Sequence, residues 1–312
     1  MYRKIMGFLE AWKESKHRKP LILQGARQVG KTYSILEFGR THYENVAYFN
    51  FETNPKLNET FEENISPDYL IPILSHIAGQ TIVKEKTLMV FDEVQLCERA
   101  LTSLKYFCEN APDYHIIVAG SLLGVAVNRT KFSFPVGKVD MKTLYPMDME
   151  EFMMALGEDD LVNQIKKCFQ TDTPLPSALH DAAMQLYRQY LVVGGMPECV
   201  MQFAGTKDYI LVRHTQDTIL ASYLNDMSKY NTLNEIKKTR LAYDNITVQL
   251  SKKNTRFQYK LIKKSGRASE FENAIEWLCL SGIVSQVYKV EQIKKPLENY
   301  RDIDAFKIYV SD

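Results

Sequence analysis

Cysteine, histidine and long apolar runs are scarce in this sequence, and each scarcity argues against a class of protein. The five cysteines are scattered, odd in number and without a C-x-x-C pair, which argues against a disulfide framework and fits a reducing cytosol. The six histidines do not cluster, so a structural zinc site is not expected. The longest apolar run, Ile116 to Val127, is interrupted by glycine and serine and is too short to span a bilayer.

Neither sign of charge dominates the chain. With 39 Lys and Arg against 38 Asp and Glu, the formal net charge of +1 gives no electrostatic indication of a partner. Met1 to Pro20 contains Lys, Arg and Glu where a signal peptide would be apolar, and we therefore expect a cytoplasmic protein. A length of 312 residues accommodates two domains, or three small ones.

The N-terminal half is organised around residues 25–32, which follow the apolar run Pro20 to Gln24 and fit G-x-x-x-x-G-K-[ST] at every fixed position. A strand before this loop and a helix after it, to about Arg40, would aim backbone N–H groups and a positive helix end at phosphates. We expect Lys31 to reach the β- and γ-phosphates and Thr32 to ligate Mg²⁺. The expected nucleotide-binding residues are Gly25, Ala26, Arg27, Gln28, Val29, Gly30, Lys31, Thr32 and Tyr33.

A second motif closes an apolar run, Thr87 to Phe91, with the carboxylates of Asp92 and Glu93. It is predicted to lie at the carboxyl end of a strand neighbouring the phosphate-loop strand. Asp92 would then hold Mg²⁺, usually through water, and Glu93 would orient the attacking water. The alternative is a strand end followed by a solvated acidic turn.

Further strands are predicted at 46–51, 114–119 and 136–144, with helical segments at 2–17, 55–79 and 98–109 and breaks at Pro67 and Pro72. Ser121, just past the fourth strand, would contact the γ-phosphate or the attacking water, or be an ordinary turn serine. An extra strand between the phosphate-loop and Asp-Glu strands favours a water-activating ATPase over a small-molecule kinase. The sequence contains no N-K-x-D motif, which argues against a GTPase.

From Pro146 onward the pattern is largely helical, with helices predicted at 148–154, 158–170, 177–192 and 207–226 and a clear break at 194–197. The predicted domains are an ATPase core at 1–146, a helical lid at 147–229 and a winged-helix-like domain at 230–312. The last of these would contain helices at 234–250 and 269–280, the second well capped, and a hairpin of 282–290 with 305–310.

Positive charge gathers in this last domain. Between Ile236 and Arg267 there are ten basic residues and one acidic residue, Asp244. The stretch 236–267 is therefore a candidate surface for DNA. A solvated basic face and a docking surface for a protein remain open alternatives.

The chain resembles the bacterial and archaeal AAA-type P-loop ATPases that carry a C-terminal domain of unknown function. The resemblance rests on the phosphate loop and on five further stretches: Phe91-Asp92-Glu93-Val94-Gln95, Ala119-Gly120-Ser121-Leu122-Leu123, Leu144-Tyr145-Pro146-Met147, Val193-Gly194-Gly195-Met196-Pro197-Glu198 and Ala305-Phe306-Lys307-Ile308-Tyr309. It implies an α/β fold with a parallel sheet and helices on both faces. It also implies ATP at 25–32, Mg²⁺ at Asp92 and hydrolysis assisted by Glu93.

Two departures from this family pattern affect the prediction. Many relatives have an arginine where this chain has Lys138, and lysine lacks the bidentate fork that binds phosphate. Relatives also usually continue beyond the strand at 305–310, so we expect a shortened member.

Two functions of different classes follow from the sequence. The first is a Mg-dependent ATPase whose nucleotide state repositions a lid and a basic winged-helix domain, with DNA as a candidate partner. The second is a DNA-binding regulator that holds ATP as a structural ligand with little or no turnover. A switch that docks an acidic protein partner is a third reading. Oligomerisation would let Arg129, Arg188, Arg213 or Arg267 act across an interface.

Overall fold

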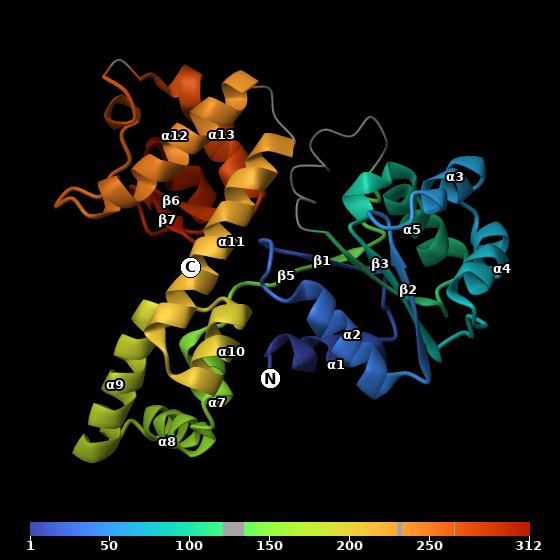
Figure 1. Cartoon of the computed structure of the whole chain (residues 1–312), viewed down its shortest axis with the longest axis horizontal. Helices are drawn as coiled ribbons and strands as arrows, with labels where there is room; N and C mark the ends of the chain where they lie inside the picture. Colours follow the sequence, from blue (N-terminus) through green and yellow to red (C-terminus); the bar gives the residue numbers. More distant parts are fainter. Residues whose placement is uncertain (121–133, 230–232, 265) are drawn as a thin grey trace. The chain divides into compact units, whose positions relative to one another are not determined.

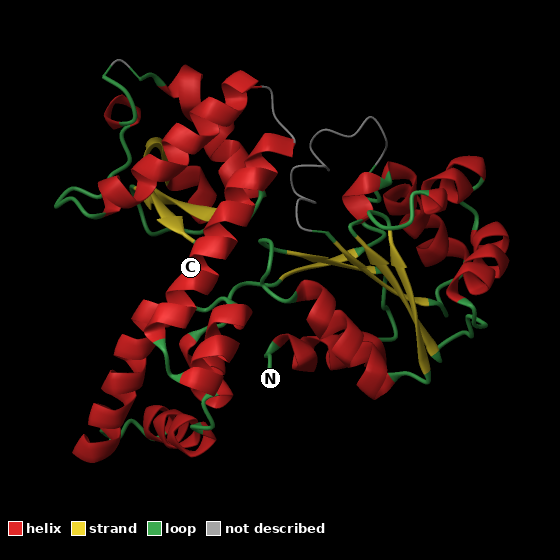
Figure 2. Ribbon diagram, viewed as in Figure 1, coloured by secondary structure: helices red, strands yellow, loops and turns green. Residues whose placement is uncertain are grey.

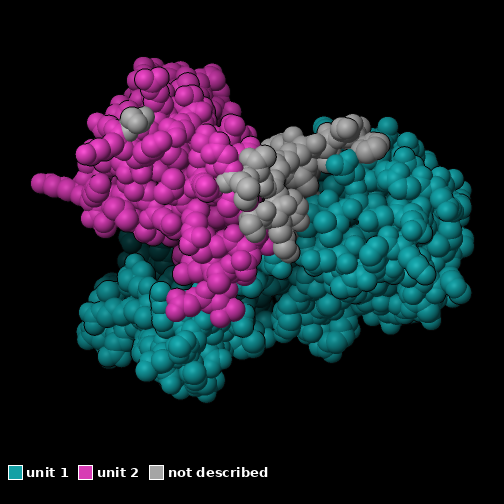
Figure 3. Space-filling view, turned by 45° about the horizontal axis from the view of Figure 1, so that its top comes forward, with its two compact units in different colours: residues 1–216 teal, residues 217–312 magenta. Residues whose placement is uncertain are grey.

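The structure is a computed structural model, and it describes residues 1–312 apart from 121–133, 230–232 and 265. It divides into two compact units, residues 1–216 and 217–312 (Figure 3). The boundary between these units lies within one helix, α11 (Tyr209–Lys229). The three-part division drawn from the sequence stays a prediction.

The first unit is built on a five-stranded sheet in the order β2-β3-β4-β1-β5, in which every paired neighbour is parallel (Figure 2). The predicted α/β fold with a parallel sheet is confirmed. The strands are β1 (Leu21–Gln24), β2 (Asn45–Asn50), β3 (Thr87–Asp92), β4 (His115–Ala119) and β5 (Asp140–Thr143).

Helices cover both faces of this sheet, with α1 and α2 on one face and α3, α4 and α5 on the other (Figure 1). Because side chains alternate along a strand, Met89 and Phe91 face one side of β3 and Leu88 and Val90 face the other, and all four are buried. The helices are α1 (Ile5–Glu14), α2 (Lys31–His42), α3 (Lys56–Glu63), α4 (Pro67–Ala78) and α5 (Glu98–Asn110), with a 3-10 turn η1 (Val94–Leu96) before α5.

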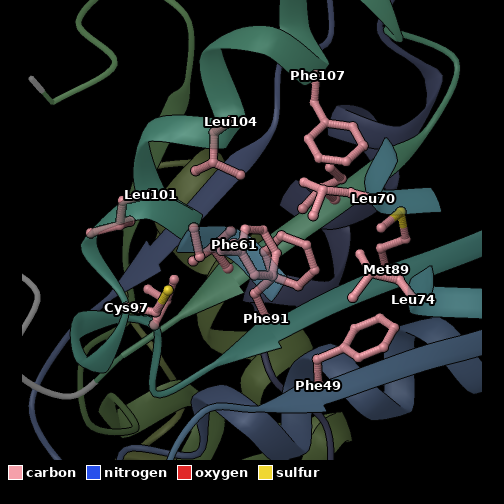
Figure 4. Packing of buried hydrophobic residues seen from close by; sticks show 14 of the residues in the cluster. Phe49, Phe61, Leu70, Leu74, Met89, Phe91, Cys97, Leu101, Leu104 and Phe107 are labelled. Carbon is pink, nitrogen blue, oxygen red and sulfur yellow. The ribbon is translucent and has the colours of Figure 1, made fainter. Parts of the chain in front are cut away.

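The core on the α3–α5 side is rich in phenylalanine (Figure 4). The Phe91 ring on β3 meets Phe49 on β2 and Phe61 on α3 in near-perpendicular contacts, with centroids 5.8 and 5.7 Å apart. Edge-to-face pairs of this kind add stabilisation beyond the area that they bury. The core therefore fixes the strand that ends at Asp92.

Three predictions about local structure in the first unit were wrong. The strand next to β1 is β4, not the Asp-Glu strand β3, because β4 pairs with both. The fifth strand begins at Asp140, after a turn at Pro135–Lys138. Pro72 lies inside α4 without ending it, since Leu70 and Leu74 on either side are buried in the core. The predicted break at 194–197 is present, but the helix that follows it, α10 (Pro197–Thr206), was not predicted. Pro197 is the first residue of this helix, a position that tolerates proline.

Beyond β5 the first unit is helical, and hydrogen bonds that involve the loop residues between its helices hold them together. Tyr190 on α9 donates a hydrogen bond to the carbonyl of Met147, and Met147 N–H donates to the carbonyl of Gly195 (2.6 Å). Asp148 and Glu151 form a capping box on α7. The helices are α7 (Met149–Ala155), α8 (Asp159–Gln170), α9 (Ser177–Val193), α10 (Pro197–Thr206) and α11 (Tyr209–Lys229), which runs into the second unit.

Replacing Gly195 with alanine is expected to lower the free energy of unfolding by about 1–3 kcal/mol. A Cβ at this position would lie 2.1 Å from the carbonyl oxygen of Met147. Gly205→Ala is the matched control, because a Cβ there would meet no described atom within 4 Å and alanine favours a helix. Urea unfolding of both variants measures the difference, and equal stabilities would contradict the close approach.

The second unit combines helices with a two-stranded antiparallel sheet in which Val284 pairs with Val310. Helices followed by a hairpin are what the sequence predicts. The good cap expected on the 269–280 helix is absent from the described residues, where Arg267 occupies the N-cap without a capping side-chain bond. The elements are α12 (Leu233–Leu250), η2 (Tyr259–Leu261), α13 (Ala268–Leu280), β6 (Val284–Val290), η3 (Leu297–Tyr300) and β7 (Arg301–Val310).

Within the described part of the chain, none of the helices has the length and apolar character needed to cross a membrane.

Candidate nucleotide site

The phosphate loop leaves the carboxyl end of β1 and returns at the start of α2. Gly25, Gln28 and Gly30 all have positive φ angles, of 147°, 66° and 88°. Position 25 also requires glycine for steric reasons, since a Cβ there would lie 2.1 Å from the carbonyl oxygen of Leu144. Successive residues in such conformations turn their N–H groups toward a common point, which is how a loop binds an anion.

Lys31 begins α2 and folds back onto this loop. Its Nζ donates to the carbonyl oxygens of Ala26 (2.7 Å) and Gly25 (2.9 Å), and the residue is 7% exposed. Burial lowers the pKa of Lys31 to about 8, although the carboxylates of Glu93 and Asp92 act in the opposite direction. The ammonium group is therefore held in a site that favours an added negative charge.

The low pKa of Lys31 predicts a pH-dependent stability. Below its ordinary pKa of 10.5 and above about 8, the folded chain binds fewer protons at this group than the unfolded chain does, so stability rises with pH across this window. Relative to Lys31→Met, the wild-type protein should gain on the order of 3 kcal/mol between pH 8 and 10.5. Urea unfolding at several pH values measures this gain. Lys56→Met, on the exposed side of α3, should give a flat difference, and a flat difference for Lys31 would contradict the burial effect.

Asp92, the last residue of β3, joins the two motifs. Thr32 Oγ1 donates to its Oδ2 at 2.9 Å, and Asp92 is 5% exposed. The Tyr48 hydroxyl donates to the same Oδ2 at 2.7 Å. Sequence reasoning missed Tyr48. A tyrosine two residues before the end of the adjacent strand is a signal that could have found it, because β2 ends level with β3, with Asn50 paired to Asp92.

Glu93 follows β3 directly, in the left-handed region with φ 52° and ψ 38°. Its N–H donates to Asp92 Oδ1 at 3.0 Å, and Gln95 Nε2 donates to its carboxylate. Non-glycine residues in this conformation cluster at functional sites. The bond from Gln95 restricts where the Glu93 carboxylate points.

The oxygen atoms of Thr32 and Asp92 are chemically suited to Mg²⁺. The ion prefers oxygen ligands, keeps several waters and is usually held by one or two carboxylates together with substrate phosphates. Here a buried carboxylate, Asp92, is already hydrogen-bonded to the hydroxyl of Thr32. No group of three His, Cys, Asp or Glu side chains suited to a metal ion is found among the described residues. The oxygens of Thr32 and Asp92 would therefore hold the ion together with water and phosphate.

Comparisons with known proteins identify the family. Residues 17–153 match the family model described as an AAA domain, and residues 184–312 match one described as a domain of unknown function. The chain therefore contains a P-loop AAA domain followed by a C-terminal domain of unknown function. A search of curated proteins found no match.

Among solved structures, a Walker-type ATPase supports the fold of this AAA-type chain. A Walker-type ATPase of Pyrococcus abyssi is 13% identical with a TM-score of 0.58, over 99% of this chain and 93% of that one. The Aeropyrum pernix ORC2 protein, solved as ADPNP-ADP complexes, is 13% identical with a TM-score of 0.47, over 99% and 90%. Identities this low show the fold alone.

The remaining site residues predicted from the sequence differ in how far they are buried. Ala26 and Val29 are buried in the loop, Arg27 is half-buried and Tyr33 is exposed on the first turn of α2. Ser121 and Arg129 lie outside the described residues. Arg188, Arg213 and Arg267 have exposed side chains. The structure thus brings Lys31, Thr32, Asp92 and Glu93 together.

Lys138, the residue in the place of the family's arginine, does not lie near the phosphate loop. It precedes β5, and β5 runs parallel to β1, so Lys138 sits at the amino end of the sheet. Its Nζ forms an ion pair with Glu109 at 2.9 Å. A role on the γ-phosphate is therefore excluded for Lys138.

Sequence reasoning also missed Arg3, which packs behind the phosphate loop and is 4% exposed. Its guanidinium donates to the carbonyls of Val29 and Tyr145, each at 2.8 Å, and to Glu151 Oε1 at 3.1 Å. An isolated arginine in an amphipathic segment gives no spacing signal. Arg3 ties the AAA domain's phosphate loop to helix α7.

Proposed function

We propose that this AAA-type chain binds ATP with Mg²⁺ and hydrolyses it. The observation that carries the proposal is the hydrogen bond from Thr32 to Asp92, made beside a buried lysine on a phosphate loop. Mg²⁺, held by Thr32 and Asp92, would neutralise charge on the phosphates. Loop N–H groups and Lys31 would bind the β- and γ-phosphates.

Glu93 has the role of orienting water in this proposal. A carboxylate next to the cation-binding aspartate is placed to accept a proton from the attacking water, and its bond with Gln95 keeps it oriented. Lys31 would exchange its two carbonyl contacts for phosphate contacts, so that binding changes the loop itself.

Nucleotide-dependent motion would reach the helices through Arg3. Val29 belongs to the loop and Glu151 belongs to α7, and one guanidinium contacts both. A shift of the loop on nucleotide binding therefore changes the anchor of the 147–206 helices, which supports a lid role for them. Repositioning of the second unit belongs to the same proposal.

The test is steady-state ATP hydrolysis with Mg²⁺, measured with and without duplex DNA. Turnover that DNA raises would support a DNA-coupled ATPase. Turnover indifferent to DNA would keep the ATPase and point to a protein partner. Bound nucleotide without turnover would contradict the ATPase and favour the regulator.

DNA binding by the second unit is the alternative function, because nine of the ten basic residues between 236 and 267 are exposed. In a winged-helix arrangement α13 would enter a groove. Its exposed side, however, carries Glu272 and Glu276, which phosphates would repel. We therefore assign DNA contact to α12 and residues 251–267.

Replacing Lys252 and Lys253 with glutamine is expected to reduce the slope of log affinity against log salt by about 2, since each lost phosphate contact removes close to one released counterion. Fluorescence anisotropy with a labelled duplex measures the slope. The matched control is Lys56→Gln with Lys105→Gln, two exposed lysines of the first unit. Equal slopes for both pairs would move the DNA contact away from the 251–267 segment.

A further inference from the structure

Tyr48 is unusual because the residue is 38% exposed while its hydroxyl reaches a buried carboxylate. The residue lies on β2, the edge strand of the sheet, two positions before the residue that pairs with Asp92. Side chains two residues apart on a strand leave the same face, so Tyr48 and Asn50 extend on one side. The Tyr48 hydroxyl donates to Asp92 Oδ2 at 2.7 Å.

Asn50 helps to hold Tyr48 in this position. Its Nδ2 donates to the Tyr48 hydroxyl at 3.2 Å, and its Oδ1 accepts the N–H groups of Glu52 and Thr53. The amide is thereby fixed by the turn after β2. A hydroxyl that accepts from a fixed amide and donates to a carboxylate has a defined orientation.

The acceptor positions on Asp92 are nearly all in use. An ionised carboxylate has about four lone-pair positions, two on each oxygen. Oδ2 accepts from Thr32 (2.9 Å) and Tyr48 (2.7 Å), and Oδ1 accepts the N–H of Glu93 (3.0 Å). A carboxylate that holds a hydrated cation through water must accept hydrogen bonds from the waters of that cation. The Tyr48 hydroxyl takes one of the positions that those waters would use.

We propose that Tyr48 is a positioning residue that occupies an acceptor position of Asp92 and releases it when the cation and nucleotide bind. The proposal rests on the proposed function, because it gives Asp92 the role of holding hydrated Mg²⁺. The hydroxyl keeps the buried carboxylate hydrogen-bonded when the site is not loaded. Breaking this bond raises the Mg²⁺ concentration at which the site fills.

Tyr48→Phe is expected to lower the half-saturating Mg²⁺ concentration by about three- to tenfold, the worth of one net hydrogen bond. The readout is the fluorescence anisotropy of a labelled non-hydrolysable ATP analogue, titrated with Mg²⁺ at fixed protein concentration. The matched control is Tyr69→Phe, which also removes a tyrosine–carboxylate bond, to Glu63 in the α3–α4 region. The control should keep the wild-type midpoint.

A second measurement observes the wild-type hydroxyl. With the ring carbon that bears the hydroxyl labelled by ¹³C in every tyrosine, the Tyr48 resonance should shift when Mg²⁺ and the analogue are added together, and the Tyr69 resonance should not. If the phenylalanine variant folds poorly, Tyr48→Leu is a second variant in which the absence of one tyrosine signal identifies the Tyr48 resonance.

The outcomes separate this inference from the proposed function. A lowered midpoint with a shifted Tyr48 resonance supports the inference. An unchanged midpoint overturns it, and a raised midpoint overturns it by showing that Tyr48 supports Asp92 in the loaded state. Failure of the wild-type protein to bind the analogue at any Mg²⁺ concentration would overturn the proposed function, and the inference with it.

Discussion

Replacing Lys31 with alanine is expected to lower kcat for ATP hydrolysis by at least about 100-fold. Without nucleotide, Lys31 Nζ donates to two carbonyl oxygens of the phosphate loop, those of Ala26 at 2.7 Å and Gly25 at 2.9 Å. Negative charge on the phosphates would replace those carbonyls as its partner, and in a buried site such a charge contact is strong. Phosphate release under saturating ATP and Mg²⁺ measures the loss.

The fold should survive this substitution. Removing the buried ammonium relieves a desolvation cost but leaves the carbonyls of Gly25 and Ala26 without this donor, so the thermal midpoint of Lys31→Ala without nucleotide should stay close to the wild-type value. Lys56→Ala on α3 is the control and should retain full turnover. A Lys31→Ala protein that hydrolyses ATP at a wild-type rate would remove the phosphate loop from the mechanism.

Replacing Glu93 with glutamine is expected to reduce kcat by about 100- to 10,000-fold, the range for loss of a general base, with little change in nucleotide affinity. The amide keeps the size of the side chain and removes its ability to take a proton. Because Asp92 and Thr32 are untouched, binding of a labelled ATP analogue with Mg²⁺ should stay near the wild-type value. Parallel binding and turnover assays separate the two effects.

Glu62→Gln provides the comparison for this second variant. Glu62 is an exposed carboxylate on α3, 3.6 Å from Arg99, and its loss should leave turnover unchanged. Retained activity in Glu93→Gln would show that another group positions the water. Weaker nucleotide binding with unchanged kcat would place Glu93 in binding rather than in proton transfer.

Sequence reasoning worked best where the signal was local. The phosphate loop and the Asp92–Glu93 pair are contiguous motifs, and the strands before them are marked by uninterrupted apolar residues. The structure places both motifs at the carboxyl ends of parallel strands and joins them by the Thr32–Asp92 bond. All strands of this sheet run in the same direction, so residues that directly follow a strand lie at the same edge of the sheet. A motif directly after a strand therefore predicts where its residues lie.

Long-range contacts could not be predicted from one sequence. The insertion of β4 between β1 and β3 depends on pairing between strands far apart in the chain. The persistence of α4 through Pro72 depends on core contacts that outweigh one missing N–H. Tyr48 and Arg3 likewise act through partners that no periodicity marks.

The partners of Arg3 also have a consequence for the order in which the chain is made. Arg3 is synthesised long before two of its partners, because Glu151 follows it by 148 positions and Tyr145 by 142. While the nascent chain is shorter than this, its guanidinium can reach the Val29 carbonyl but not its counter-ion. The back of the phosphate loop is therefore completed only after the whole sheet and the start of α7 have left the ribosome, so the nucleotide site is completed well after its own motif has been translated.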